Sequence, residues 1–111
     1  MQFKDHKPIF LQIAELISDE ILGGKYPEGE RLPSVREYAA EVEVNVNTVV
    51  RSFEWLSQKD IIFNKRGIGY FVADDARAKV LETQKEDFLT REVPVIKRKM
   101  DLLGLDAKIF M

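Results

Sequence analysis

The side chains that could bind a polyanion gather in three stretches of the chain that contain no acidic residue. These stretches cover residues 31–36, 45–51 and 64–70. Their five cationic residues are Arg31, Arg36, Arg51, Lys65 and Arg66. Lysines and arginines that contact phosphates release counterions from a nucleic acid, so such clusters are the electrostatic signature of phosphate binding. The stretches therefore indicate a phosphate-binding surface, and the alternative is that solvated arginines fall there by chance.

The net charge of the whole chain gives no hint of such a surface. The formal charge is −2, and residues 1–74 hold nine lysines and arginines against twelve acidic residues, a balance of −3. Net charge averages over all faces of a protein, so it argues against a generally basic coat but not against a local one. The distribution of charge decides whether a nucleic acid is a candidate partner.

Two of the three stretches also carry residues suited to entering a groove of DNA. Asn45, Asn47 and Thr48 stand where a helix is predicted to begin, and a helix N-terminus favours phosphate while asparagine can pair with adenine edges. The alternative is that Asn45 only caps the helix and Thr48 only fills a turn. A cation at a hairpin tip, such as Arg66 beside Gly67, can enter a minor groove, or it can be a solubilising charge.

Catalytic and metal-binding chemistry has little support in this composition. The chain has no cysteine and one histidine, His6, which excludes disulfides, a cysteine nucleophile and a zinc site built from several histidines or thiolates. No histidine accompanies a serine in a local arrangement, and no glycine-rich phosphate loop follows a strand. We therefore expect no enzyme activity, no metal and no cofactor, and we expect His6 to be solvated.

Nothing in the sequence suggests a membrane or secretion. No apolar run approaches the roughly 18 residues that a membrane span needs. The start of the chain, residues 1–7, is polar and no secretory segment follows it. A cytoplasmic protein without a membrane partner is expected.

The elements that would position these residues begin with a helix predicted over residues 8–23. Its apolar residues recur at spacings of three and four, with Pro8 in the first turn and Gly23–Gly24 as a left-handed stop. These apolar residues are Ile9, Phe10, Ile13, Leu16, Ile17 and Ile21. Two prolines and a glycine in residues 26–33 then predict a rigid loop rather than a regular element.

Two further helices follow the loop. Ser34 and Glu37 have the spacing of a capping box, which opens a helix predicted over residues 35–42. Asn45 can cap the next helix, which is predicted to run to about Lys59. Two helices joined by a tight turn, with polar residues at the start of the second, are typical of a helix-turn-helix.

A β-hairpin is predicted directly after these helices. β-favouring residues at 61–63 and 70–72 flank a turn that contains two glycines. A helix-turn-helix followed by a hairpin is a winged helix, so the fold class is α+β, mainly helical with one small hairpin. This domain is expected to cover residues 1–73.

The remainder, residues 74–111, is too short for a separate domain with its own core. Asp75 could cap a helix over residues 76–92, and Pro94 is predicted to break it before a second helix. In that second helix a heptad-like apolar seam needs a partner surface or remains exposed. The seam consists of Ile96, Met100, Leu103, Ala107 and Phe110. We expect a two-helix segment that forms a dimer.

Four motifs, in unbroken order and with matching spacing, closely resemble the GntR family of bacterial transcription regulators. They are residues 8–13 (PIFLQI), 29–37 (GERLPSVRE), 44–49 (VNVNTV) and 66–72 (RGIGYFV). The short tail, and asparagines where many relatives carry serine and arginine, resemble the YtrA-like subfamily. Members of that group lack a large effector-binding domain, dimerise through C-terminal helices and in many cases control transport genes.

The resemblance also implies roles for individual residues. It implies that Arg36 contacts DNA, that Asn45, Asn47 and Thr48 enter the major groove, and that Arg66–Gly67 makes the wing contact. Three positions depart from the family pattern. Val46 stands where many relatives have an arginine, so base specificity at that position does not carry over. Arg51 lies one place beyond an arginine that is common in other branches of the family, which favours a contact with phosphate over one with a base. Asp60 replaces the usual glycine at the end of the third helix and should still permit a left-handed turn.

The function expected from residues and resemblance together is sequence-specific regulation of transcription. A homodimer would bind an inverted-repeat operator in double-stranded DNA as a repressor, with transporter genes as candidate targets and an unknown effector. The expected DNA contacts are Arg31, Ser34, Arg36, Asn45, Asn47, Thr48, Arg51, Lys65, Arg66 and Gly67. The alternative is a winged-helix module that binds proteins and not DNA.

Overall fold

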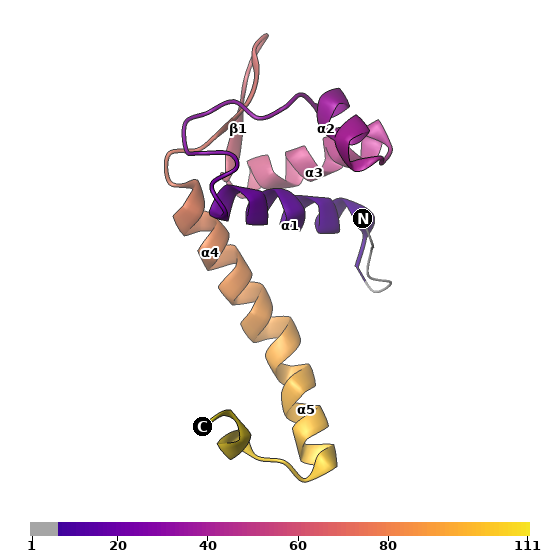
Figure 1. Cartoon of the computed structure of the whole chain (residues 1–111), viewed down its shortest axis with the longest axis vertical. Coiled ribbons are helices and arrows are strands. Elements are labelled where there is room, and N and C mark those ends of the chain that lie inside the picture. The colour runs from indigo at the N-terminus through magenta and orange to yellow at the C-terminus, as the bar shows by residue number, and fades with distance from the viewer. Residues whose placement is uncertain (1–6) are drawn as a thin grey trace. The chain divides into compact units, whose positions relative to one another are not determined.

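The structure, a computed structural model, describes residues 7–111 and divides into two units (Figure 1). The first unit ends at Val80 and the second begins at Leu81. His6 lies outside the described residues. Each helix within residues 7–111 is too short or too polar to span a lipid bilayer.

Helix α1 (Ile9–Leu22) confirms the first predicted helix. Pro8 is its N-cap and therefore lies just before the first turn rather than within it. The left-handed stop is supplied by Gly24, at φ +87°, because Gly23 keeps right-handed geometry. The predicted stripe is buried at its centre, where Ile13 is fully buried, whereas Ile9 at the start is 47% exposed.

Helices α2 (Val35–Val42) and α3 (Val46–Gln58) confirm the helix-turn-helix. The turn between them contains no glycine, and Glu43 supplies its left-handed residue at φ +58°. The Val44 N–H then donates to the Ala39 carbonyl at 3.1 Å, which closes the C-terminus of α2. This reversal is what brings the first turn of α3 next to the end of α2.

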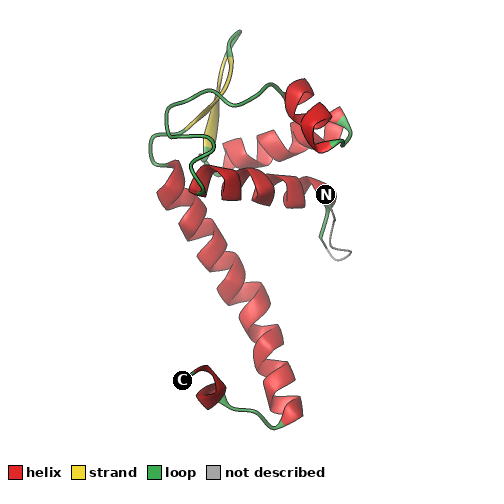
Figure 2. Ribbon diagram, in the orientation of Figure 1, coloured by secondary structure: helices red, strands yellow, loops and turns green. Residues whose placement is uncertain are grey.

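The hairpin consists of β1 (Ile62–Lys65) and β2 (Gly69–Val72), antiparallel, and confirms the predicted wing (Figure 2). Asp60 adopts left-handed geometry at φ +59° between α3 and β1, as expected at this family departure. One feature of the wing was missed: the segment predicted as a rigid loop partly pairs with β2. Its Arg31 forms a β-bridge with Phe71.

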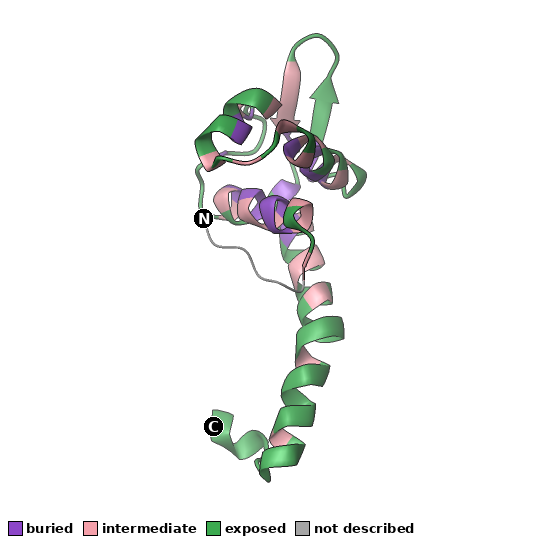
Figure 3. Ribbon diagram, turned by 90° about the vertical axis from the view of Figure 1, so that its right-hand side faces the viewer, coloured by how far each residue is buried: buried purple, intermediate pink, exposed green. Residues whose placement is uncertain are grey.

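The core of the winged unit lies where its three helices and the inner face of the hairpin meet. Phe53 of α3 is fully buried and packs edge-on against Tyr70, with ring centroids 5.0 Å apart. Helix α4 (Ala76–Asp87) adds its start to this core, since Ala76 and Val80 are fully buried. Its later turns are mostly exposed (Figure 3). The winged unit therefore extends past the predicted boundary at residue 73.

The predicted helix break at Pro94 is wrong. Helix α4 is followed without a loop by a π-helical segment, η1 (Phe88–Glu92), and by α5 (Val93–Leu103). A proline in a helix lacks an N–H for the carbonyl four residues back and its ring crowds that carbonyl. Widening the preceding turn accommodates it, and the Val93 N–H accordingly donates five residues back, to Phe88.

The predicted seam is also corrected, because its five residues do not share one helix. Helix α5 ends at Leu103, and Gly104 takes up left-handed geometry at φ +69°. A short 3-10 helix, η2 (Ala107–Phe110), follows after a turn. Ala107 and Phe110 therefore lie on η2, and the chain reverses after α5 instead of at Pro94.

Candidate nucleic-acid interface

The first turn of α3 presents three of the predicted contact residues. Asn45 is the N-cap, and its Oδ1 accepts a hydrogen bond from the Asn47 N–H at 2.8 Å. The Asn45 side chain is thus partly committed to holding the helix. Asn47 is exposed and Thr48 is half-buried beside it, so Asn47 is the side chain that this turn presents most openly.

The N-terminus of α2 is held by the predicted capping box. The Glu37 N–H donates to the Ser34 hydroxyl and the Ser34 N–H donates to the Glu37 carboxylate, both at 3.1 Å. That backbone donor, followed by the Ser34 hydroxyl, holds the pKa of Glu37 below its ordinary value. Arg36 is exposed in the same turn. The box fixes the backbone from which Arg36 projects.

Helix α2 is tied to α1 by a network around Glu20. The Tyr38 hydroxyl donates to Glu20 at 2.6 Å, and Lys25 lies 2.9 Å from Glu20 and 3.1 Å from Glu41. Burial, and then the hydrogen bond to Glu20, raises the pKa of Tyr38, while the bonds to Glu20 and Glu41 raise the pKa of Lys25. Both groups keep their protons at physiological pH, so the network persists there and fixes α2 on its support.

The outer face of the hairpin brings two of the predicted cations together. Phe63 and Phe71 stack there at 5.9 Å, and the Lys65 ammonium lies 4.4 Å from the centre of the Phe71 ring. Arg31 reaches the same face, because a Cβ on Gly69 would lie only 3.0 Å from its Nε. Gly69 therefore leaves the space in which the Arg31 side chain lies.

The tip of the hairpin presents the third predicted cation of the wing. Arg66 and Gly67 are exposed in a turn closed by the Ile68 N–H, which donates to the Lys65 carbonyl at 2.9 Å. Gly67 has φ +78°, as expected for a turn glycine. The turn thus carries Arg66 at the exposed end of the wing.

Arg51 lies apart from the other cations, one turn further along α3 and beside α1. Its guanidinium carbon is 4.1 Å from the centre of the Phe10 ring. Next to it, the Ser52 hydroxyl donates to the Phe10 carbonyl at 2.6 Å. The sequence predicted Phe10 only as part of an apolar stripe. Its contact with Arg51 joins two separate helices, and no local sequence pattern indicates such a contact.

Within residues 7–111 the five cations form no ion pair with a carboxylate. Arg31, Arg36, Arg51, Lys65 and Arg66 are all exposed, and none of them takes part in an ion pair within residues 7–111. The ion pairs in that range use other lysines and one other arginine. The helix-turn-helix and the wing therefore present positive charge that is available to a polyanion.

Comparisons with known proteins agree with this arrangement. Residues 10–72 match the family of bacterial regulatory proteins named after gntR. The chain is 31% identical over 100 residues to the HTH-type transcriptional repressor YtrA of Bacillus subtilis, covering 90% of this chain and 71% of that one.

Two solved structures are also similar. A GntR-family regulator from Bacteroides thetaiotaomicron is 48% identical with a TM-score of 0.79, covering 93% of this chain and 89% of that one. BusR of S. agalactiae, solved in complex with its busA-promoter DNA, is 25% identical with a TM-score of 0.64, covering 80% and 44%. The family consists of DNA-binding regulators rather than enzymes. This chain belongs to the GntR family of bacterial transcriptional regulators, and its winged unit is a helix-turn-helix DNA-binding domain.

Proposed function

We propose that this regulator binds an inverted-repeat operator as a two-fold homodimer and represses transcription from it. In each half-site, α3 enters the major groove with Asn47 and Thr48 near base edges. Arg36 contacts DNA at the start of α2, and Arg66 with Gly67 contacts the adjacent minor groove. The observation that carries this proposal is the set of exposed cations on the helix-turn-helix and wing that form no ion pair with the described part of the chain.

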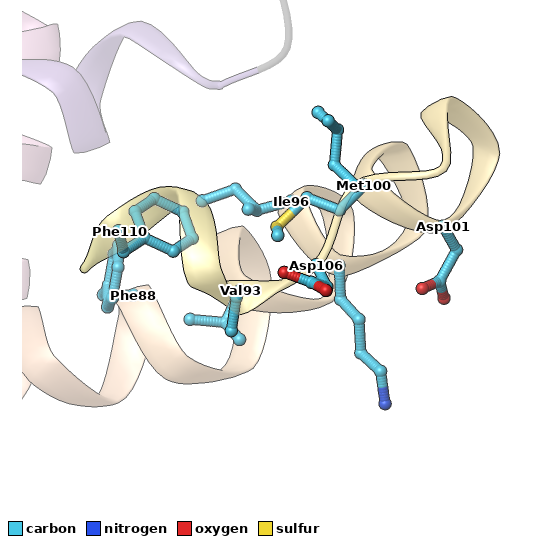
Figure 4. Close-up of a pocket in the computed structure, with 10 residues that line it drawn as sticks. Phe88, Val93, Ile96, Met100, Asp101, Asp106 and Phe110 are labelled. Carbon is cyan, nitrogen blue, oxygen red and sulfur yellow. The ribbon is translucent and has the colours of Figure 1, made fainter.

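The second unit is the proposed dimerisation element. Eleven of the fourteen large apolar residues that are exposed in the described chain fall within residues 81–111. Between α5 and η2 an apolar groove of about 510 Å³ is lined by side chains that include Phe88, Ile96, Met100 and Phe110 (Figure 4). A concentration of apolar surface of this kind marks a protein interface. We assign to the proposed interface five residues divided between α5 and η2, of which all but Leu103 line the groove: Ile96, Met100, Leu103, Ala107 and Phe110.

Dimerisation is part of the proposed binding mechanism because one winged domain contacts few phosphates. Three to five cations per protomer would give a dimer about six to ten phosphate contacts. The logarithm of the binding constant would then fall with the logarithm of salt concentration with a slope of roughly −5 to −9. One bound half-site also tethers the second, which raises affinity without any new contact.

The name of the relative YtrA, a transcriptional repressor, supports repression as the regulatory outcome. Transporter genes are the proposed targets on the resemblance to that subfamily. Repression is tested by placing the operator between a promoter and a reporter. Expression of the chain should lower reporter output, whereas a rise would identify an activator.

The experiment that tests DNA recognition is selection of bound sequences from a pool of random duplexes. The selected sequences should contain two inverted half-sites centred about one helical turn, or a multiple of it, apart. Affinity for the selected duplex should rise steeply as salt is lowered, with a shuffled duplex of equal length as the control. Absence of binding at low salt would instead support a winged-helix module that binds proteins.

A further inference from the structure

We propose that Phe10, at the start of α1, is a positioning residue for DNA binding that holds the Arg51 guanidinium ready for a phosphate. This inference rests on the proposed function, because it assigns a role to a residue that supports one of the proposed contacts. It adds a residue outside the helix-turn-helix and the wing to the DNA-binding machinery.

Phe10 contacts α3 through both its ring and its backbone carbonyl. The Arg51 guanidinium carbon lies 4.1 Å from the centre of the Phe10 ring, which is well within the distance for a cation–π contact. The buried Ser52 hydroxyl shares its one proton between the Phe10 carbonyl at 2.6 Å and the Thr48 carbonyl at 3.0 Å. The Ser52 bond holds the Phe10 backbone against α3, so the ring has a fixed place from which to contact Arg51.

This contact leaves the functional part of the guanidinium available. Arg51 is exposed and makes no ion pair within the described residues, where its guanidinium contacts the Phe10 ring. A ring contacts a guanidinium through the face of the planar group, whereas phosphate is bound by the N–H groups at its edge. Phe10 can therefore hold Arg51 while Arg51 binds a phosphate.

Holding the side chain in place strengthens binding because a free arginine loses rotational freedom when it contacts DNA. A guanidinium already held by a ring has lost part of that freedom in the unbound protein. This part of the rotational freedom is lost when the domain folds, so its loss does not oppose the binding of DNA. Phe10 thus acts on DNA affinity without touching DNA.

The test is a double-mutant cycle on the selected operator duplex. Phe10→Leu keeps apolar volume and the backbone carbonyl but removes the ring, and it should weaken binding roughly two- to fivefold. Phe10→Tyr keeps the ring and should bind like the wild type. In an Arg51→Ala background, Phe10→Leu should cause no further loss. Ile9→Ala, a change at a neighbouring position that is 47% exposed, is the matched control and should leave affinity unchanged.

Each other outcome overturns the inference in a distinguishable way. If Phe10→Leu weakens binding equally with and without Arg51, Phe10 acts through the fold alone. If Arg51→Ala weakens binding and Phe10→Leu does not, the ring does not position the arginine. If Arg51→Ala has no effect on a duplex that the wild type binds, Arg51 makes no contact, and if the wild type selects no duplex at all, the proposed function itself fails.

Discussion

The association of two protomers should depend strongly on the exposed leucines of α5, and Leu103→Asp is the sharpest test. Leu103 is 72% exposed in the described chain. Complete burial of a leucine side chain contributes roughly 1.5–3 kcal/mol, so burial of this exposed part contributes about 1–2 kcal/mol. A two-fold interface counts each residue twice. Loss of Leu103 from both protomers therefore costs about 2–4 kcal/mol of association free energy.

That loss corresponds to a dimer dissociation constant roughly 30- to 700-fold larger, before the added cost of bringing two carboxylates into the interface. Sedimentation velocity over a concentration series measures it directly. Ile68→Asp, at a position in the wing turn that is 55% exposed, makes the same chemical change in the other unit and should leave the dimer intact. A Leu103→Asp protein that dimerises with wild-type affinity would show that the interface lies elsewhere.

Three further predictions concern the start of α2. Arg36→Ala should weaken operator binding by about 1–3 kcal/mol while urea unfolding stays unchanged; unaltered affinity would remove Arg36 from the contact set. Ser34→Ala should lower the unfolding free energy by about 1 kcal/mol through loss of the cap, and a stability equal to wild type would mean that the box contributes nothing. Because the pKa of Glu37 is lowered in the folded state, the stability that its carboxylate contributes should be present at neutral pH and be lost as pH falls through that lowered pKa. An acid titration followed by circular dichroism measures this loss, and the Glu37→Gln protein should not show it.

The helices of the winged unit could be predicted from the sequence because their starts depend on local chemistry. The Ser34–Glu37 box and the Asn45 cap satisfy free N–H groups within three residues of themselves, so the residue types alone place the helix starts. Asp60 illustrates the same point, since an aspartate tolerates left-handed geometry at modest cost. The DNA-contact roles of the predicted residues remain predictions.

The helices of residues 74–111 could not be predicted equally well. Whether Pro94 ends a helix depends on whether the preceding turn can widen, and no local sequence rule decides this. Proline disfavours the preceding helical turn, yet a wider π-helical turn at η1 removes the clash without ending the helix. The Thr90 hydroxyl also donates to the Glu86 carbonyl at 2.8 Å and supports that turn. The exact helix end was set instead by Gly104, whose left-handed geometry stops α5. A seam drawn across this stop joins residues of two different elements.

Contacts between elements were the other feature beyond the reach of sequence reasoning. Nothing near Arg31 in the sequence indicates that it lies over Gly69, and nothing near Arg51 indicates the ring of Phe10. Such pairs are 38 and 41 positions apart, so no periodicity or spacing rule relates them. Only the packing of the hairpin and of α1 on α3 brings them together.

The negative net charge of the chain is compatible with DNA binding because some of its cations are paired with carboxylates and others are not. Lys25 lies between Glu20 and Glu41, and Lys79 lies 3.7 Å from both Asp60 and Asp75. Exposed pairs of this kind add little stability, but they offset the charge of acidic groups within the winged unit. Because interactions between exposed charges fade over about 8 Å at physiological salt, a phosphate at the wing responds chiefly to the unpaired cations near it. A formal charge of −2 summed over the chain therefore says little about the potential that DNA meets, and the separation of paired from unpaired cations matters more than the total.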